Sequence, residues 1–170
     1  MRVLAPIVAL AALSFAGVAS AATVTIAPIT FDSEFQTELN ETIGETEAGY
    51  LRERVERAVT RALERAGAQV GPGGDATIEV VIVDADPNRP TFQELSDQPS
   101  LDYGRSISIG GAELRGVLRG ADGGVIAEVT HDYYTPSLDY VMAAGTWTDA
   151  ERAIRGFAEK LADAYAANAR

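Results

Sequence analysis

Residues 106–119 read Ser-Ile-Ser-Ile-Gly-Gly-Ala-Glu-Leu-Arg-Gly-Val-Leu-Arg, and residues 125–134 read Val-Ile-Ala-Glu-Val-Thr-His-Asp-Tyr-Tyr. Both stretches largely alternate apolar and polar side chains, which is the period of a β-strand with one buried face. The segment 120–124, Gly-Ala-Asp-Gly-Gly, has the composition of a turn. Together they predict an antiparallel hairpin, and this hairpin decides the fold class because its apolar face needs another layer to cover it.

The first strand of this hairpin changes the parity of its apolar positions. Ile107 and Ile109 are odd, whereas Ala112 and Leu114 are even. A regular strand cannot move its apolar side chains from one face to the other without an extra residue. We therefore expect a β-bulge at the glycine pair 110–111.

Two more strands and two helices are predicted on either side of the hairpin. Segments 23–29 and 76–84 are rich in β-branched residues, and Pro28 disturbs the first of them. Segment 47–66 and a segment beginning at the capping-box quartet 148–151, Thr-Asp-Ala-Glu, carry apolar residues at helical spacing. The order is β-α-β-β-β-α, which predicts an α+β two-layer sandwich: a mixed four-stranded sheet with two helices on one face. Segment 32–47, with six acids and no base, is expected to be a solvated loop with part of a helix start.

The first 21 residues predict export. Arg2 precedes the apolar stretch 3–18, and Ala19-Ser20-Ala21 has the small side chains that a signal peptidase recognises. We expect a cleaved signal peptide at 1–21, a single domain at 22–170, and a periplasmic or secreted protein without a stable membrane anchor. The chain has no cysteine, which excludes thiol catalysis and cysteine-ligated metals, and its net charge of −11 disfavours nucleic acid as a partner.

The segment 84–105 is the longest predicted loop, and long loops in compact domains commonly bind ligands. Asp84, Asp86 and Asn88 imitate the start of a calcium-binding loop, but Arg89 occupies the position where that loop requires glycine. The alternative is that the two aspartates end a strand and begin a turn. We expect no cofactor.

Three aromatic residues are candidates for ligand contact. Phe92 and Tyr103 lie in the long loop, where they either line a pocket or fasten the loop to the domain. Trp147 precedes the last helix, where it either contributes to a ligand-contacting patch or covers the open end of the core.

His131 is the only histidine and therefore the only side chain suited to act as a general base at neutral pH. It falls on the apolar parity of its strand, which favours a neutral histidine near the edge of the core. The alternative is a small hydrolase or transferase, which requires a serine and an acid near His131.

The chain resembles small bacterial envelope or periplasmic accessory domains of unknown function, in which lipoprotein-like α+β families are common. The resemblance rests on the strand 76–84, Ala-Thr-Ile-Glu-Val-Val-Ile-Val-Asp, the long loop with its prolines, and the hairpin 106–129. It departs from the lipoprotein members because no cysteine follows the leader. The resemblance implies a compartment and a fold, and it implies no assigned catalysis.

One set of apolar residues lies on the face of the sheet that the helices leave uncovered. This set consists of Val81, Val83, Val117, Ile126 and Tyr134. Apolar side chains on an otherwise solvated face are typical of an interaction surface. We therefore expect a non-enzymatic domain that binds an envelope protein, or a second copy of itself, through this open face. The alternatives are catalysis by His131 and ligand or cation binding by the 84–105 loop.

Overall fold

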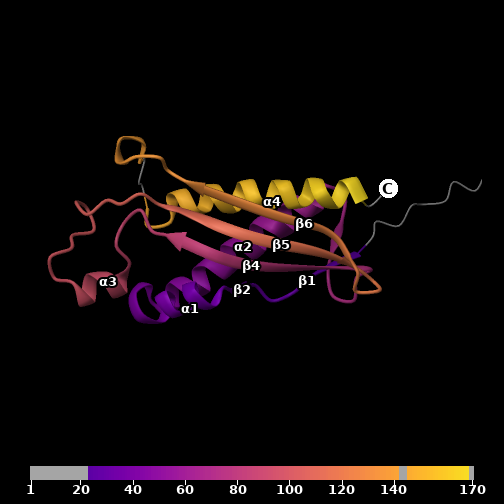
Figure 1. Ribbon diagram of the computed structural model, residues 1–170, viewed down its shortest axis with the longest axis horizontal. Helices are drawn as coiled ribbons and strands as arrows, with labels where there is room; N and C mark the ends of the chain where they lie inside the picture. Colours follow the sequence, from indigo (N-terminus) through magenta and orange to yellow (C-terminus); the bar gives the residue numbers. More distant parts are fainter. Residues whose placement is uncertain (1–22, 142–144, 169–170) are drawn as a thin grey trace, which may run out of the picture.

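The computed structural model describes residues 23–141 and 145–168 (Figure 1). The predicted signal peptide at 1–21 lies outside these residues. Among the described helices, none is both long enough and apolar enough to cross a membrane.

The strands are β1 (Thr23–Ile26), β2 (Thr30–Phe31), β3 (Gln69–Val70), β4 (Ala76–Asp86), β5 (Gly111–Gly120) and β6 (Val125–Tyr134). The helices are α1 (Ser33–Glu38), α2 (Glu45–Arg65), α3 (Phe92–Asp97) and α4 (Thr148–Asn168), with a π-helical turn η1 (Leu39–Ile43) after α1 and a 3-10 turn η2 (Leu138–Tyr140) after β6.

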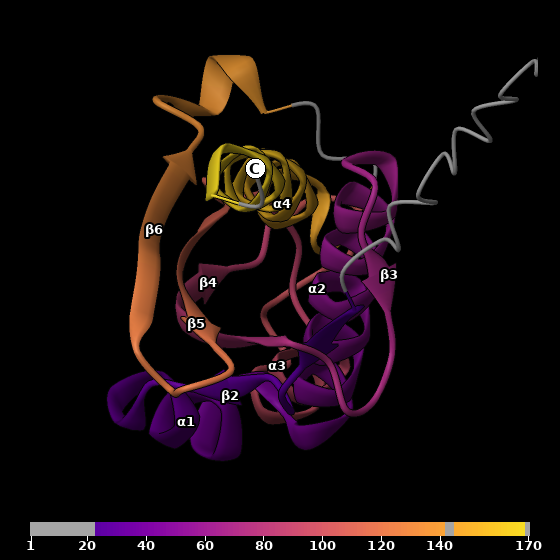
Figure 2. The same cartoon turned by 90° about the vertical axis from the view of Figure 1, so that its right-hand side faces the viewer.

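These elements form the mixed sheet that the sequence predicts, in the order β3-β1-β4-β5-β6, with β2 also paired to β4. β1 and β2 run parallel to β4, as expected for a strand-helix-strand crossover through α2, whereas β4, β5 and β6 are antiparallel neighbours. Figure 2 shows β4, β5 and β6 curving around α4, with α2 beside it on the same side of the sheet. The other face of these three strands is not covered by a long helix.

The expected count of four strands and two helices is wrong. Pro28 lies between β1 and β2 and divides the first predicted strand into two. The acidic segment is helical because Phe35, Leu39 and Ile43 recur every four residues and are buried in the core. Within the long loop, Thr91 and Glu94 form a reciprocal capping box that starts α3.

The core lies between the sheet and the two long helices. Gly116 of β5 allows a close approach of α4, because a Cβ atom at that position would lie 2.8 Å from Cζ of Phe157. Phe157 and Leu161 are fully buried against this strand. Replacing Gly116 with any larger residue would therefore displace the central helix contact.

The predicted bulge at 110–111 is wrong. β5 begins at Gly111, and its pairing with β6 is regular from Gly111 opposite Tyr134 to Leu118 opposite Ala127. Ile107 and Ile109 precede the strand and are 43% and 39% exposed, so they do not share its buried face. The sheet has register shifts at two other places: Val83 of β4 is the extra residue between Ile82 and Asp84, and Ile126 of β6 is the extra residue between Val125 and Ala127.

Both glycines are nevertheless required, for a reason other than a bulge. Neither has a positive φ angle. A Cβ atom at Gly110 would lie 2.5 Å from Nδ2 of Asn88, and one at Gly111 would lie 2.3 Å from the carbonyl oxygen of Tyr133. The close approach of these neighbours therefore selects glycine at both positions.

We expect Gly110→Ala and Gly111→Ala each to lower the free energy of unfolding by about 1–3 kcal/mol, the usual cost of overpacking. Gly49→Ala in α2 is the matched control, because no atom lies within 4 Å of its Cβ position and its φ angle is negative. The control is expected to gain about 0.5–1 kcal/mol from helix propensity. Urea denaturation curves test all three variants, and equal stability of the two alanine variants and the parent would contradict this explanation.

Candidate functional site

A buried polar junction joins the long loop to the start of α4. The side-chain amide of Asn88 donates from Nδ2 to Oδ2 of Asp149 at 2.7 Å, and its Oδ1 accepts from the backbone N–H of Asp149 at 2.8 Å. Asn88 is fully buried and Asp149 is 1% exposed. The amide thus satisfies both the carboxylate and the backbone of the same residue, which fixes the loop relative to the helix.

Two further donors complete the junction. The hydroxyl of Thr135, just after β6, donates to Oδ2 of Asp149 at 2.6 Å, and Nη1 of Arg152 donates to Oδ1 at 3.0 Å. The backbone N–H of Ser108, shortly before β5, also donates to the carbonyl oxygen of Asn88. The segments after β4, before β5, after β6 and at the start of α4 therefore meet at this junction. Because every group is paired, we assign this cluster a structural role.

The predicted capping box at 148–151 is not formed. The Thr148 hydroxyl donates to the carbonyl oxygen of Gly145. The carboxylate of Glu151 instead accepts from the Tyr50 hydroxyl and forms an ion pair of 2.9 Å with Arg54. The local pattern predicts that Glu151 caps α4, but its side chain contacts α2 instead.

Two of the three proposed cation ligands are held by other contacts. Asn88 is committed to Asp149, and Oδ2 of Asp84 accepts from the Tyr134 hydroxyl at 2.7 Å. Burial, followed by the charge of Asp84, raises the pKa of Asp86. Burial and the bond to Asp84 raise the pKa of Tyr134 well above its usual range. Within the described residues, no group of three or more histidine, aspartate or glutamate side chains is arranged to hold a metal ion.

His131 lies on the inward face of β6, as its parity predicts. Its Nδ1 lies 3.0 Å from Nζ of Lys160 in α4, and its Nε2 would lie 2.5 Å from a Cβ atom at Gly156. Burial, followed by the charge of Lys160, lowers the pKa of His131. In the described part of the chain its ring forms no hydrogen bond with a serine or a carboxylate, so the partners that the hydrolase hypothesis requires are not brought to it.

The three candidate aromatic residues do not form one site. The indole Nε1 of the buried Trp147 donates to Oε2 of Glu47 in α2 at 2.6 Å, so this residue covers the end of the core. The ring centroid of Tyr103 lies 5.6 Å from Cζ of Arg89, and Nη1 of Arg89 also donates to the Tyr103 carbonyl oxygen. These contacts join two parts of the same loop. Phe92 is 84% exposed and makes no such attachment.

The open face of the sheet carries a line of apolar residues. The register places Val81 of β4 and Val117 of β5 at diagonal positions on the side away from the helices. Ile126 of β6 lies at a register shift that leaves it without a partner in β5. Ile126 is 42% exposed, and the two valines are half-buried. Tyr134 belongs to the same face, where its hydroxyl is bound by Asp84.

Charged residues surround this apolar line. The carboxylates on this face outnumber the guanidinium groups: Glu79, Asp84, Asp86, Glu113, Glu128 and Asp132 stand against Arg115 and Arg119. Arg119 is already paired to Glu79 at 3.0 Å. The open face is therefore an apolar line within a net negative surface.

Among the strands that the structure describes, β6 is the last in the order, so it leaves one edge of the sheet unpaired. Its sequence contains neither proline nor lysine, the residues that commonly block edge-to-edge pairing. An extended segment of another chain has the geometry to add to this edge.

Comparisons with known proteins identify the fold. No family model and no curated protein sequence matches this chain. Protein XCC0632 from Xanthomonas campestris, described by the family model DUF330, is 17% identical, with 88% of this chain and 86% of that chain covered and a TM-score of 0.55. The hypothetical protein CT253 from Chlamydia trachomatis is 10% identical, with 88% and 100% covered and a TM-score of 0.51.

A minor lipoprotein from Acinetobacter baumannii is less similar, at 10% identity with 86% and 94% covered and a TM-score of 0.41. Identities this low are evidence of a shared fold only. The similarity to XCC0632 and CT253 agrees with the predicted resemblance to α+β domains without an assigned function.

We expect Asp149→Ala to lower the free energy of unfolding by about 3 kcal/mol, because Asn88, Thr135 and Arg152 would lose their shared acceptor in a buried site. Asp163→Ala, on an exposed position of the same helix, is the control and is expected to change stability by less than about 0.5 kcal/mol. Thermal and urea melts measure both, and similar losses in the two variants would show that the junction contributes little.

A proton NMR titration should show the single imidazole titrating below its usual midpoint, because burial and Lys160 disfavour the charged ring. A pKa lower in the folded than in the unfolded state means that the unfolded chain binds more protons, so stability falls as the pH drops below the unfolded pKa. Lys160→Met should move the midpoint upward by removing the positive charge. A midpoint at or above the usual value in the parent protein would contradict this geometry.

Proposed function

We propose that the protein is a non-enzymatic accessory protein of the bacterial envelope that binds a protein partner through the open sheet face. The observation that carries the proposal is the diagonal pair Val81 and Val117 on the open face, together with the exposed Ile126 in the edge strand β6. Apolar side chains gathered on an otherwise solvated sheet face are typical of an interaction surface.

The envelope location is supported by the expected signal peptide at 1–21 and by the resemblance to envelope accessory domains. Processing of the leader and release into the periplasm belong to the proposal. The absence of an anchoring cysteine distinguishes this chain from acylated lipoproteins.

The partner is expected to supply an extended segment with basic side chains. An extended backbone can pair with the free edge of β6, where specificity comes from alternate side chains. Its basic groups would meet Glu128 and Asp132, which point to the open side of that strand. Because exposed charge pairs are screened by salt, the association rate should fall as the ionic strength rises.

Photo-crosslinking in the bacterium of origin tests this proposal. A photoreactive residue at Val117 should capture a partner, whereas one at Phe92, which is 84% exposed on α3, should not. The double variant Val81→Asp, Val117→Asp should weaken binding of the captured partner at least tenfold, or about 1.4 kcal/mol. Phe92→Asp introduces one such charge away from the sheet and should leave binding unchanged. A strictly monomeric protein with no crosslink at Val117, or binding that both sets of variants leave unchanged, would refute the proposal.

A further inference from the structure

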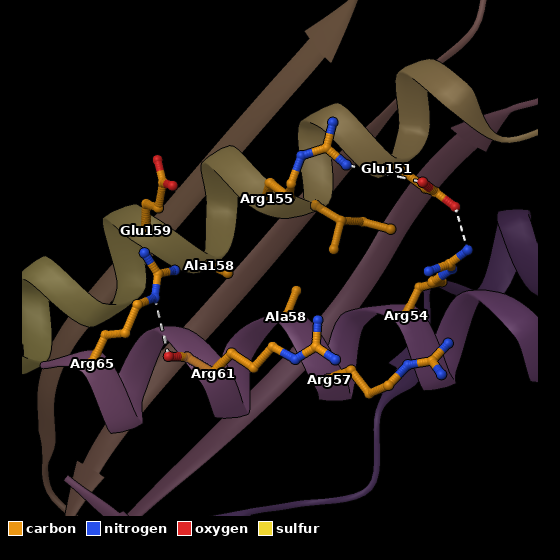
Figure 3. Close-up of a pocket in the computed structure, with 10 residues that line it drawn as sticks. Arg54, Arg57, Ala58, Arg61, Arg65, Glu151, Arg155, Ala158 and Glu159 are labelled. Carbon is orange, nitrogen blue, oxygen red and sulfur yellow. Dashed lines mark hydrogen bonds and ion pairs between the residues drawn. The ribbon is translucent and has the colours of Figure 1, made fainter. Parts of the chain in front are cut away.

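A groove rich in arginine separates α2 from α4. Its cavity measures about 370 Å³. Arginines and glutamates form its walls: Arg54, Arg57, Arg61, Arg65, Arg155, Glu151 and Glu159. Its floor is apolar and consists of Ala58, Ile154 and Ala158. Figure 3 shows the α2 arginines in a row along the groove, with Arg155 and Glu159 on the opposite helix. Five arginines against two glutamates leave an excess of three positive charges in a chain whose net charge is −11.

The arginine row is not explained by internal ion pairs. Glu151 is shared by Arg54, at 2.9 Å, and Arg155, at 3.9 Å. Arg57 pairs with Glu53 on its own helix. Among the described residues, Arg61 and Arg65 form no ion pair with a carboxylate, and Nε of Arg65 donates only to the backbone of Arg61.

The spacing of the row also opposes helix stability. Arg57, Arg61 and Arg65 are each four residues apart, and like charges at that spacing repel one another on a helix. A glutamate at the middle position, between two arginines, would instead give attractive pairs at this spacing. The fold therefore holds three guanidinium groups together on one side of a groove against their mutual repulsion.

We propose that this groove is a binding site for a ligand with several phosphate groups. Guanidinium groups bind phosphate oxygens in a bidentate manner, and every cation that lines the groove is an arginine. Successive arginines are about 6 Å apart along the helix axis, so the row fits an elongated anion better than a single phosphate. The alanine floor admits the chain of such a ligand between the two helices. The groove belongs to the helix layer and is separate from the partner-binding face of the sheet.

Isothermal titration of the full-length chain with sodium tripolyphosphate tests this site. We expect saturable binding in 50 mM NaCl that weakens strongly in 300 mM NaCl, whereas orthophosphate binds at least tenfold more weakly. The double variant Arg61→Gln, Arg65→Gln should lose at least tenfold in affinity for tripolyphosphate. The double variant Arg61→Lys, Arg65→Lys keeps the positive charges but loses the paired N–H donors of the guanidinium groups. Its affinity for tripolyphosphate should lie between those of the parent and the glutamine variant.

The matched control is Arg115→Gln, Arg119→Gln, which removes the same charge from the open sheet face and should leave binding unchanged. The melting temperature of each variant is measured as well, so that a loss of binding at an unchanged melting temperature cannot be attributed to unfolding. Flotation with vesicles containing phosphatidylglycerol distinguishes the source of the phosphate groups. Vesicle binding that depends on Arg61 and Arg65 assigns a lipid headgroup, and tripolyphosphate binding alone assigns a free polyphosphate. The absence of saturable tripolyphosphate binding in 50 mM NaCl, or an equal loss in the control variant, would overturn the proposal.

Discussion

The paired hydrogen bonds between Asn88 and Asp149 determine how one whole end of the molecule is assembled. The two residues lie 61 positions apart in the sequence and are both buried. Around them meet the exit from β4, the entry to β5, the exit from β6 and the start of α4. Since a buried acceptor or donor that loses its partner is costly, none of these segments can move independently of the others. The negative charge of Asp149 in the first turn of α4 also interacts favourably with the helix dipole.

The parts of the fold that the sequence predicts well are those whose pattern is local. β6 lies at 125–134 as predicted, α4 begins at Thr148, and α2 covers the predicted helix within two residues at its start. Their periodicity depends only on which side chains face the core. The prediction of a bulge at the glycine pair 110–111 is wrong because Ile107 and Ile109 alternate with polar residues as in a strand, although they precede β5. Their segment is held instead by Asn88, a partner that no local pattern reveals.

The candidate site shows the same division between local and distant information. Parity placed His131 on the inward face correctly, but its contact with Lys160 on another helix was not foreseeable. Asp149 was interpreted as part of a capping box, and its role emerged only with its distant partners. Arg57, Arg61 and Arg65 recur every four residues and therefore lie on one face of α2. The sequence alone makes this face a solvated one, and only the packing of α4 beside it makes it the wall of a groove.

The two-layer architecture separates the charges of this protein in space. The open sheet face is net negative around its apolar line, whereas the groove between α2 and α4 is net positive. The sheet face and the groove belong to different layers, so a partner on the sheet does not obstruct a ligand in the groove. The basic partner and the phosphate-bearing ligand that we propose would therefore occupy separate sites. The packed core between the two sites keeps their opposite charges from neutralising each other.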